Sequence, residues 1–277
     1  MNYIMDKETT LMSFLLTKYS RTNAKAYLKY KQVYVNDLNT SQFDRILHIG
    51  DVVEINKDKK IESDLNILYE DDDFIVINKP SGLLSVAGGG ESNKTAFHLV
   101  NQYLKTKDKK TRAYVVHRLD KDTSGILMFS KSEEMKETLQ ANWNDIVSKR
   151  GYIAIVEGNL SPKLGTIKNY LDESKTQQVY ICKSGGKLAI TNYKVIKENR
   201  FFSMVDIDLK TGRKNQIRVH MQSIGHSIVD DKKYGASSNP IKRLGLHCHC
   251  FAFKHPITQK EMQFTAPIPS SFTQLFQ

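Results

Sequence analysis

Several features that would point to common protein classes are scarce in this 277-residue sequence. It has only three cysteines, Cys182, Cys248 and Cys250, an odd number that argues against a disulfide framework and favours a reducing cytoplasm. No apolar run is long enough to span a bilayer, and Asp6 and Glu8 interrupt the start, so we expect neither a membrane helix nor a signal peptide. The sequence also shows no repeat of fixed period and no low-complexity tract.

Acidic residues are outnumbered, with 30 Asp and Glu against 41 Lys and Arg, for a net charge of +11. A surplus of this size suits a polyanionic partner, because each Lys or Arg placed on a phosphate releases a condensed counterion. Charge alone leaves a nucleic-acid-binding protein and an ordinary basic protein about equally open. The hydrophobic fraction of 40% is enough for a substantial core, and the length fits one large domain with a small one.

Motifs of other enzyme classes are incomplete. Gly88-Gly89-Gly90 lacks the Lys-Ser/Thr ending of a nucleotide-binding loop, which favours a flexible loop or lid. His117 and Ser124 lie near acidic residues, but no nucleophile elbow accompanies them, which argues against a hydrolase. Residues 247–250 read His-Cys-His-Cys, yet on a strand the two residue types would face opposite sides. We therefore interpret them as partly buried core residues and expect neither a metal nor a cofactor.

The N-terminal part of the chain reads as a small α/β unit. Helical spacing of apolar residues predicts a helix around Leu11–Leu15, and a second helical segment follows from about Arg21 to Lys31. Short strands are predicted at Val33–Val35, before an Asn36-Asp37 turn, and at Val52–Ile55. Two helices followed by short strands are typical of a compact RNA-binding arrangement.

A basic stripe strengthens the RNA-binding interpretation of this unit. Four residues recur every three or four positions and would share one face of the helical region: Lys18, Arg21, Lys25 and Lys29. The alternative is an ordinary solvated helix face. The polar, charged segment Lys57–Glu62 is expected to be a linker, which gives predicted domains of 1–62 and 63–277.

From Leu65 onward the chain is dominated by β-branched and aromatic stretches, which predict strands. The predicted strands are Phe74–Ile77, Tyr114–Val116, Ile126–Phe129, Tyr152–Val156, Leu188–Val195 and Met204–Ile207. Helical segments are expected between them at Thr95–Leu104, Ser132–Asn144 and Lys214–Ile224. Because several strands follow one another over short connections, we expect an α+β domain with an antiparallel or mixed sheet.

Two polar segments interrupt this apolar pattern. His117–Gly125, with the sequence HRLDKDTSG, joins two apolar strands and could project charged side chains into a cleft; the alternative is a polar turn with an internal Arg-Asp pair. In Leu209–His220, a strand ends in a Gly turn and a helix opens near Lys214, with Arg213 at its start and Arg218 inside it. Positive charges are unfavourable at a helix N-terminus, because that end of the helix dipole is itself positive. These cations therefore indicate a nearby anion; the alternative is an ordinary surface helix with basic residues.

Taken together, these segments resemble the RluA-type pseudouridine synthases. HRLDKDTSG is similar to the catalytic motif of that family, and TGRKNQIRVH (211–220) is similar to its later basic motif. Residues 72–82, 149–158 and 246–269 resemble further family segments in the same order. The N-terminal unit resembles the S-four-type RNA-binding domain shared with a ribosomal small-subunit protein, through the Arg21 helix, VYVN and HIGDVV.

The resemblance implies a fold and a set of roles. The fold would be a mixed, largely antiparallel sheet with a central active-site cleft. Asp120 would be the catalytic aspartate, Tyr152 would stack on a flipped uracil and take part in proton removal, and Arg218 would hold the carboxylate and lower its pKa. Arg118 would fill the space that the base leaves, and Arg213 would contact RNA.

The expected partner is structured RNA, either large-subunit ribosomal RNA or, as the alternative, transfer RNA. A non-catalytic RNA-binding or ribosome-assembly factor is also open, although the intact set of Asp120, Tyr152 and Arg218 favours an enzyme. We expect a cytoplasmic monomer with no membrane partner. The sequence departs from the family pattern at Asn215, where the family usually has His, and at Ser227 and Asp230, where Pro and Gly are frequent.

Overall fold

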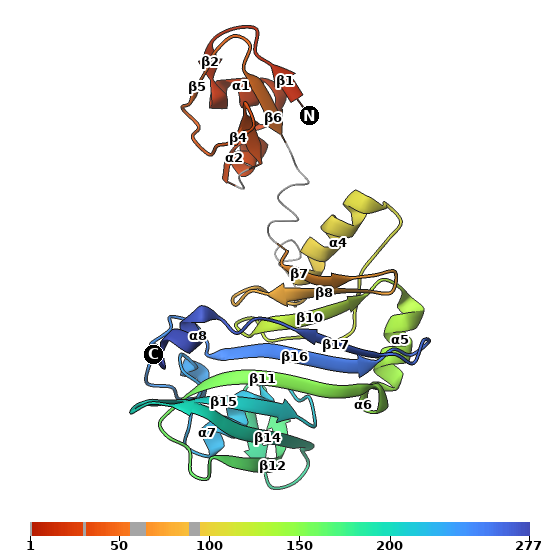
Figure 1. Cartoon of the computed structure of the whole chain (residues 1–277), viewed down its shortest axis with the longest axis vertical. Helices are drawn as coiled ribbons and strands as arrows, with labels where there is room; N and C mark the ends of the chain where they lie inside the picture. Colours follow the sequence, from red (N-terminus) through yellow and green to blue (C-terminus); the bar gives the residue numbers. More distant parts are fainter. Residues whose placement is uncertain (1, 30–31, 56–64, 89–94) are drawn as a thin grey trace. The chain divides into compact units, whose positions relative to one another are not determined.

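The computed structural model forms two compact units (Figure 1). The smaller unit comprises 1–66 and 102–109, and the larger comprises 67–101 and 110–277. The described residues are 2–29, 32–55, 65–88 and 95–277. The expected linker Lys57–Glu62 and the glycines Gly89 and Gly90 lie outside them. No helix in the described part of the chain is both long and apolar enough to cross a bilayer.

The smaller unit contains two short helices and a four-stranded sheet in the order β1-β6-β3-β4. Its elements are β1 (Asn2–Ile4), β2 (Thr9–Thr10), α1 (Leu11–Lys18), α2 (Arg21–Lys29), β3 (Val33–Val35), β4 (Leu38–Asn39), β5 (Ile46–Leu47) and β6 (Val52–Ile55). Asn36 and Asp37 have φ values of 50° and 64°, which suits the two-residue turn between β3 and β4. The helices and strands predicted here are therefore confirmed, the second helix as far as Lys29, because residues 30 and 31 lie outside the described part of the chain.

One expectation about the basic stripe was wrong. The helix α1 ends at Lys18, because the next residue, Tyr19, is extended with φ −139° and ψ 154°. Lys18 consequently belongs to a different helix from the other three residues of the stripe. Arg21, Lys25 and Lys29 lie four residues apart on α2, so they do share a helix face.

The larger unit is built on an eleven-stranded sheet in which every pairing is antiparallel except that of β10 with β16. Its strands are β7 (Ile67–Glu70), β8 (Phe74–Lys79), β9 (Tyr114–Val115), β10 (Ser124–Ser130), β11 (Val147–Glu157), β12 (Leu164–Glu173), β13 (Val179–Cys182), β14 (Lys187–Glu198), β15 (Phe202–Leu209), β16 (Leu246–Lys254) and β17 (Glu261–Thr265). The predicted mixed, largely antiparallel sheet is confirmed.

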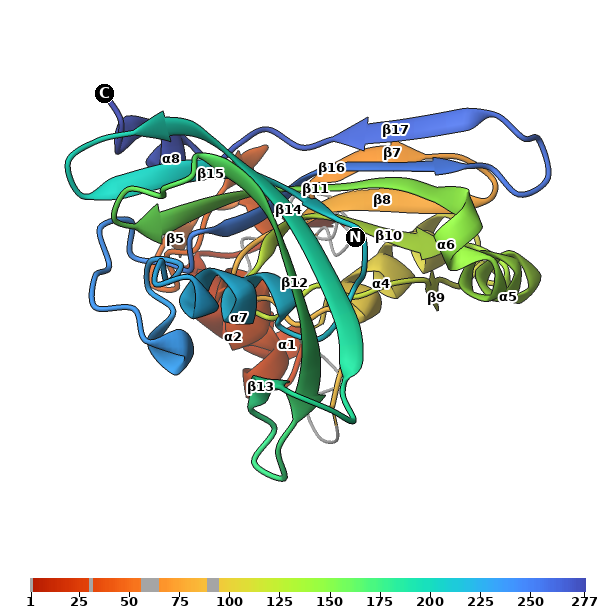
Figure 2. The ribbon, with the colours of Figure 1, turned by 90° about the horizontal axis from the view of Figure 1, so that it is seen from below.

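Helices are few beside this sheet. They are α4 (Ala96–Lys107), whose residues from 102 onward are grouped with the smaller unit, α5 (Glu133–Ala141), α6 (Trp143–Ile146), α7 (Gln216–Ser223), the short 3-10 helix η1 (Lys232–Tyr234) and α8 (Ser270–Gln274). The single helix expected at Ser132–Asn144 is divided at Asn142 into α5 and α6. The sheet curves strongly, and α7 lies beside β14 on its concave side (Figure 2).

The sheet divides where β10 meets β16. These two strands pair over only two positions, Ser124 with His247 and Gly125 with Cys248, before β10 continues beside β8 and β16 beside β11 and β17. Gly125 has φ +110°, and a Cβ there would lie 2.1 Å from the carbonyl oxygen of Cys248. Only glycine allows this close approach. The position of the loop before Gly125 is therefore fixed relative to the sheet.

Strand β11 has two different faces. Ala154 and Val156 are buried in one cluster with Ile217 and Met221 of α7, and Tyr152 packs against the same cluster. Alternate residues on a strand point to the same side, so Tyr152 faces the side of the sheet that carries α7. This alternation brings Tyr152 and the helix containing Arg218 to one face.

Candidate active site

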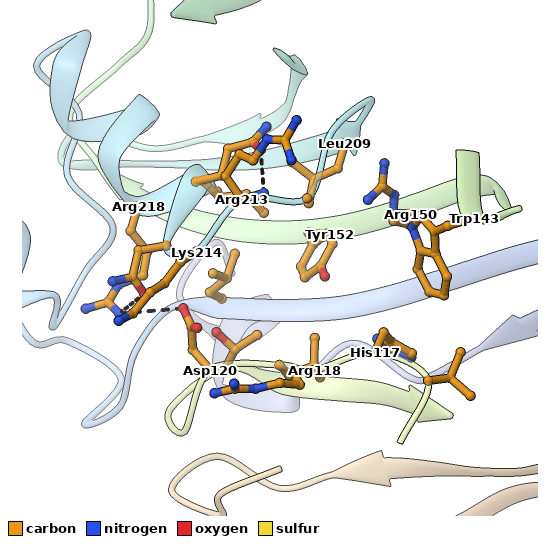
Figure 3. A pocket seen from close by; sticks show the side chains of 18 of the residues that line it. His117, Arg118, Asp120, Trp143, Arg150, Tyr152, Leu209, Arg213, Lys214 and Arg218 are labelled. Atoms are coloured by element: carbon orange, nitrogen blue, oxygen red, sulfur yellow. Dashed lines mark hydrogen bonds and ion pairs between the residues drawn. The ribbon is translucent and has the colours of Figure 1, made fainter. Parts of the chain in front are cut away.

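A cavity of about 660 Å³ in the larger unit brings together side chains that are distant in sequence. Asp120, Tyr152 and Arg218 all line it (Figure 3). Arg118 and Arg213 line it as well. The three expected catalytic residues therefore share one cavity, and so do two of the six residues expected to bind RNA. The other four belong to the smaller unit.

The residues on either side of Asp120 are held by hydrogen bonds. The backbone N–H of Leu119 donates to Ser85 Oγ at 3.1 Å, and Ser85 Oγ donates to the Leu119 carbonyl at 2.7 Å. The fully buried Lys79 Nζ donates to the carbonyl oxygens of Lys121 at 2.9 Å and Leu83 at 2.7 Å. Burial lowers the pKa of Lys79 to about 8, although Asp120 and a neighbouring aspartate oppose this shift. These bonds fix the backbone position of Asp120.

Ser124 and His117, the residues that raised the possibility of a hydrolase, are engaged elsewhere. Ser124 is 3% exposed, and its Oγ lies 2.8 Å from His247 Nδ1 and 2.6 Å from the donating Arg243 Nη2. His117 Nε2 accepts a hydrogen bond from the backbone N–H of Met128 at 3.1 Å, and burial lowers the pKa of His117 to about 4. Ser124 thus anchors the loop at the sheet, and His117 is neutral.

The electrostatic environment of Asp120 differs from the expectation. The closest approach to Arg218 is 3.6 Å, between Asp120 Oδ2 and Arg218 Nη1. Burial raises the pKa of the Asp120 carboxyl, and this effect exceeds the lowering by Arg218 and Arg118. The expected lowering of the pKa by Arg218 is present, but burial outweighs it, and the sequence gives the charges without the desolvation. The side chain remains 35% exposed, facing the cavity.

The principal partner of Arg218 is Asp231, not Asp120. Arg218 Nε donates to Asp231 Oδ2 at 2.6 Å, and Nη2 donates to Oδ1 at 2.7 Å, which makes a bidentate pair. The Asp231 side chain is only 1% exposed. The Arg218 guanidinium also lies 4.9 Å from the centre of the Tyr234 ring. The expected Asp120–Arg218 pairing is thus the weaker contact of an arginine that other residues already orient.

Asn215, the position that departs from the family pattern, takes part in this arrangement. It precedes α7 with φ 51° and ψ 19°, a left-handed conformation that Asn tolerates well. Its Oδ1 accepts a hydrogen bond from Arg218 Nη1 at 3.0 Å, and its Nδ2 donates to Tyr234 Oη at 3.0 Å. Asn215 therefore connects Arg218 to Tyr234, and helix α7 begins at Gln216 rather than at Lys214.

Tyr152 is placed by an irregularity of the sheet. The pairing of β11 with β16 shifts register between Gly151 and Tyr152, and such bulges re-aim side chains. Burial raises the pKa of the Tyr152 phenol well above its ordinary value of 10. The phenol is therefore protonated at neutral pH. Its ring offers an aromatic surface beside Asp120 (Figure 3).

The metal interpretation of residues 247–250 gains no support from the geometry. His247 is bound to Ser124, whereas His249 Nε2 lies 3.5 Å from Asp206 Oδ1. Across residues 2–29, 32–55, 65–88 and 95–277, no group of three or more His, Cys, Asp or Glu side chains is arranged to hold a metal ion.

Sequence reasoning missed the residues that support Asp120 and Arg218. Lys79 and Ser85 lie in or just after a segment with a recognised resemblance, but nothing in their local pattern predicts a contact with the loop. Asp231 and Tyr234 lie in a stretch without apolar periodicity, where an acidic residue reads as solvated. The only available signal was the unmatched cation at Arg218, which required an anion near the start of α7.

Several known proteins are similar to this chain in sequence. A family model described as RNA pseudouridylate synthase matches residues 73–223. The ribosomal large subunit pseudouridine synthase D of Haemophilus influenzae is 32% identical over 283 residues, covering 94% of this chain and 87% of that protein. An uncharacterised RNA pseudouridine synthase of Bacillus subtilis is 32% identical over 277 residues, covering 96% of this chain and 91% of that protein.

A solved structure has the same fold. Human RNA pseudouridylate synthase domain containing 4 superposes with a TM-score of 0.64 at 22% sequence identity. The match covers 78% of this chain and 92% of that chain.

Proposed function

Because this chain belongs to the RNA pseudouridylate synthase family and is a pseudouridine synthase, we propose that it isomerises uridines of large-subunit ribosomal RNA, with Asp120 as its catalytic carboxylate. The observation that carries the proposal is the cavity in which Asp120, Tyr152 and Arg218 meet. The ribosomal substrate is supported by the name of the Haemophilus relative and by the basic residues on one face of α2.

The reaction needs few chemical groups. The bond between ribose C1′ and uracil N1 breaks, the base turns, and a bond from C1′ to C5 forms; C5 loses a proton and N1 gains one, so the product is an isomer. Asp120 could act on the sugar, on the base or on a ribose proton, and each route requires its ionised form. Arg218 and Arg118 favour that form, against the effect of burial.

The target nucleotide must leave its stack before it can enter the cavity, at a cost of a few kcal/mol. We assign Arg118 to the space that the base leaves and Tyr152 to stacking on the uracil, which recovers about 1–3 kcal/mol. Since the phenol of Tyr152 is protonated at neutral pH, proton removal by Tyr152 requires that it transfer its own proton as it accepts another. Arg213, which is exposed at the cavity, is assigned to RNA contact.

The experiment compares Asp120→Asn with wild type on transcripts labelled with tritium at C5 of uridine, since the reaction releases this hydrogen. We expect Asp120→Asn to release no tritium while it binds the transcript normally. Asp122→Asn, at an exposed carboxylate two residues away, is the matched control and should keep its activity. Equal tritium release by Asp120→Asn and wild type would remove Asp120 from the mechanism.

The substrate is tested separately. We expect tritium release from a large-subunit ribosomal RNA transcript and none from unmodified transfer RNA. Release from transfer RNA alone would replace the proposed substrate and leave the assignment of Asp120 intact.

We also propose that residues 1–62 form the RNA-binding domain that the sequence predicts. Arg21 and Lys25 are exposed on one face of α2. Replacing both by Gln should weaken transcript binding and reduce the slope of log affinity against log salt by about 0.7–0.9 for each phosphate that the variant no longer binds. An unchanged slope would remove this face from RNA binding.

The proposed location is the cytoplasm, where three unpaired cysteines and an RNA substrate are compatible. The proposed assembly state is a monomer, because one chain supplies every side chain of the cavity. Sedimentation at working concentration tests the second point, and a stable dimer would contradict it.

A further inference from the structure

At the end of the cavity away from Asp120 lies an arginine that forms no hydrogen bond or ion pair with any described residue. Arg150 lines the cavity, and Figure 3 shows Tyr152 between it and Asp120. Within the described part of the chain, the Arg150 guanidinium makes no hydrogen bond and no ion pair. It rests on the backbone at Gly212, where a Cβ would lie 2.6 Å from Arg150 Nη1. Its position is therefore restrained by packing alone.

The charges around the cavity are unbalanced. Two carboxylates line it, Asp120 and Glu173, whereas five cationic side chains do: Arg118, Arg150, Arg213, Lys214 and Arg218. Lys214 is paired with Glu173, and Arg218 is paired mainly with an aspartate outside the lining. Burial lowers the pKa of Arg150, and the nearby Asp208 offsets only part of this effect, so the partly buried cation remains incompletely compensated. An anionic group of a ligand would complete this compensation.

An aromatic side chain lies at the same end of the cavity. Trp143, the single tryptophan of the sequence, lines the cavity and is partly exposed. Its ring packs against two other rings, with centroid distances of 5.8 Å to the partly buried His117 and 6.0 Å to the buried Phe251. This packing holds the indole in place for stacking. Figure 3 shows Arg150 and Trp143 at the same end of the cavity, so the cation and the aromatic ring face the same space.

We propose that Arg150 and Trp143 form a second nucleotide subsite, which binds the nucleotide adjacent to the target uridine. Arg150 binds its phosphate, and Trp143 stacks on its base. The inference rests on the proposed function, because it takes the target uracil to lie on Tyr152. Arg150 and Asp120 lie on opposite sides of Tyr152 in the same cavity (Figure 3), so a ligand that stacks on Tyr152 can extend from Asp120 toward the subsite.

A phosphate fits Arg150 better than a base carbonyl does. A desolvated guanidinium is compensated by a full negative charge, whereas a neutral carbonyl supplies a hydrogen bond only. Every nucleotide of RNA brings one phosphate, and its base brings a flat surface for Trp143. The two residues therefore match the two parts of one nucleotide.

The test for Arg150 measures binding of a large-subunit ribosomal RNA transcript over a range of salt concentrations. Arg150→Gln should reduce the slope of log affinity against log salt by about 0.7–1, the value for one bound phosphate. Arg150→Lys should restore the slope, since it keeps the charge. The matched control is Arg200→Gln, at an exposed arginine outside the cavity, and its slope should equal that of wild type. Weaker binding with an unchanged slope would mean that Arg150 contacts a base, and would overturn the phosphate assignment.

The test for Trp143 uses the opposite signature. Trp143→Leu should weaken binding at least about fivefold with the salt slope unchanged, because stacking releases no counterions. Trp143→Tyr should recover most of this loss. Equal affinity of Trp143→Leu and wild type would remove the aromatic half of the subsite.

Two further readouts keep the tests interpretable. Thermal unfolding of each variant separates a defect in binding from a defect in folding, and the Lys and Tyr variants report on the same positions with little change in packing. Tritium release by wild type is measured on the same transcript. If wild type releases none, the proposed function fails, whereas an unchanged salt slope of Arg150→Gln overturns the subsite alone.

Discussion

The two ends of the cavity are built differently. At one end the Arg218 guanidinium is bound by Asp231 and Asn215 and covered by Tyr234, and the loop of Asp120 is clamped on both sides. At the other end Arg150 has no hydrogen bond or ion pair among the described residues.

This difference separates two tasks. A catalytic carboxylate must be held at a fixed position, because an error of about 1 Å can cost roughly a hundredfold in rate, and that requires protein partners. A site for a charged ligand must leave its own charges uncompensated until the ligand arrives. Charged side chains with protein partners thus indicate the part of the cavity that performs chemistry, and charged side chains without them indicate the part that binds RNA.

The largest effect is expected at Asp231, which binds Arg218 at one end of the cavity; this end is called the paired end. Asp231→Asn leaves the buried Arg218 guanidinium without its counter-charge, which should cost about 3–5 kcal/mol in the free energy of unfolding. Because Arg218 then loses its orientation toward Asp120, kcat should fall by up to roughly a hundredfold. Urea unfolding and tritium release measure the two effects.

The control for this variant is the neighbouring residue. Asp230 is partly exposed with φ 62°, a conformation that Asn also adopts, so Asp230→Asn should leave stability and kcat close to wild type. If Asp231→Asn behaved like Asp230→Asn, the paired end would have no special role.

The second prediction concerns the pH dependence of kcat/KM, whose acid limb reports the pKa of the free enzyme. Asp120 must be ionised, so activity falls as pH falls through its pKa, which burial places above 3.8. Arg118 lowers this pKa, so Arg118→Gln should move the limb to higher pH. Asp122→Asn, at an exposed carboxylate two residues from Asp120, is the control and should leave the limb in place. A shift of about 0.2–0.7 pH units is expected for Arg118→Gln. A shift to lower pH in Arg118→Gln would contradict the assignment of the limb to Asp120.

The sequence is a good guide where a pattern is local. The strands around HRLDKDTSG, the turn at Asn36-Asp37 and the helix containing Arg218 follow from side-chain periodicity and turn residues. The helix break after Lys18 also had a local signal, because Ser20 Oγ accepts a hydrogen bond from the backbone N–H of Asn23, as an N-cap serine does. The break was therefore predictable from Ser20, but the regular spacing of the basic residues suggested one continuous helical face.

The supporting contacts could not be predicted in this way. Lys79 and Lys121 are 42 residues apart, and Arg218 and Asp231 meet only because the chain after α7 returns to the cavity. The direction of the Asp120 pKa shift depends on how much protein surrounds the carboxylate, which no local pattern encodes. Sequence therefore identified which side chains take part, and tertiary structure decides their partners.

A third prediction is that Asp120→Asn stabilises the protein while it removes activity. Since the folded pKa of Asp120 is raised above its unfolded value, the ionised carboxylate costs stability above the folded pKa, and this cost disappears as pH falls below it. The gain at pH 7 should be at most about 1 kcal/mol, because the side chain is 35% exposed. Urea unfolding at neutral and acid pH checks both the gain and its disappearance. A variant less stable than wild type at pH 7 would show that the Asp120–Arg218 contact outweighs burial.

The smallest effect is expected at Arg150, at the end of the cavity called open here because Arg150 forms no hydrogen bond or ion pair there with a described residue. The sign of the change in unfolding free energy distinguishes this open end from the paired end. Arg150→Met keeps an apolar side chain and removes a cation whose pKa is lowered by burial and which forms no ion pair within the described part of the chain. The free energy of unfolding should therefore stay equal or rise by about 0.5 kcal/mol, whereas Asp231→Asn lowers it. Urea unfolding without RNA measures this change, and Arg200→Met at an exposed site controls for the loss of a positive charge from an already basic chain. A loss of more than about 1 kcal/mol in Arg150→Met alone would mean that Arg150 stabilises the fold, and the contrast between a paired and an open end would no longer hold.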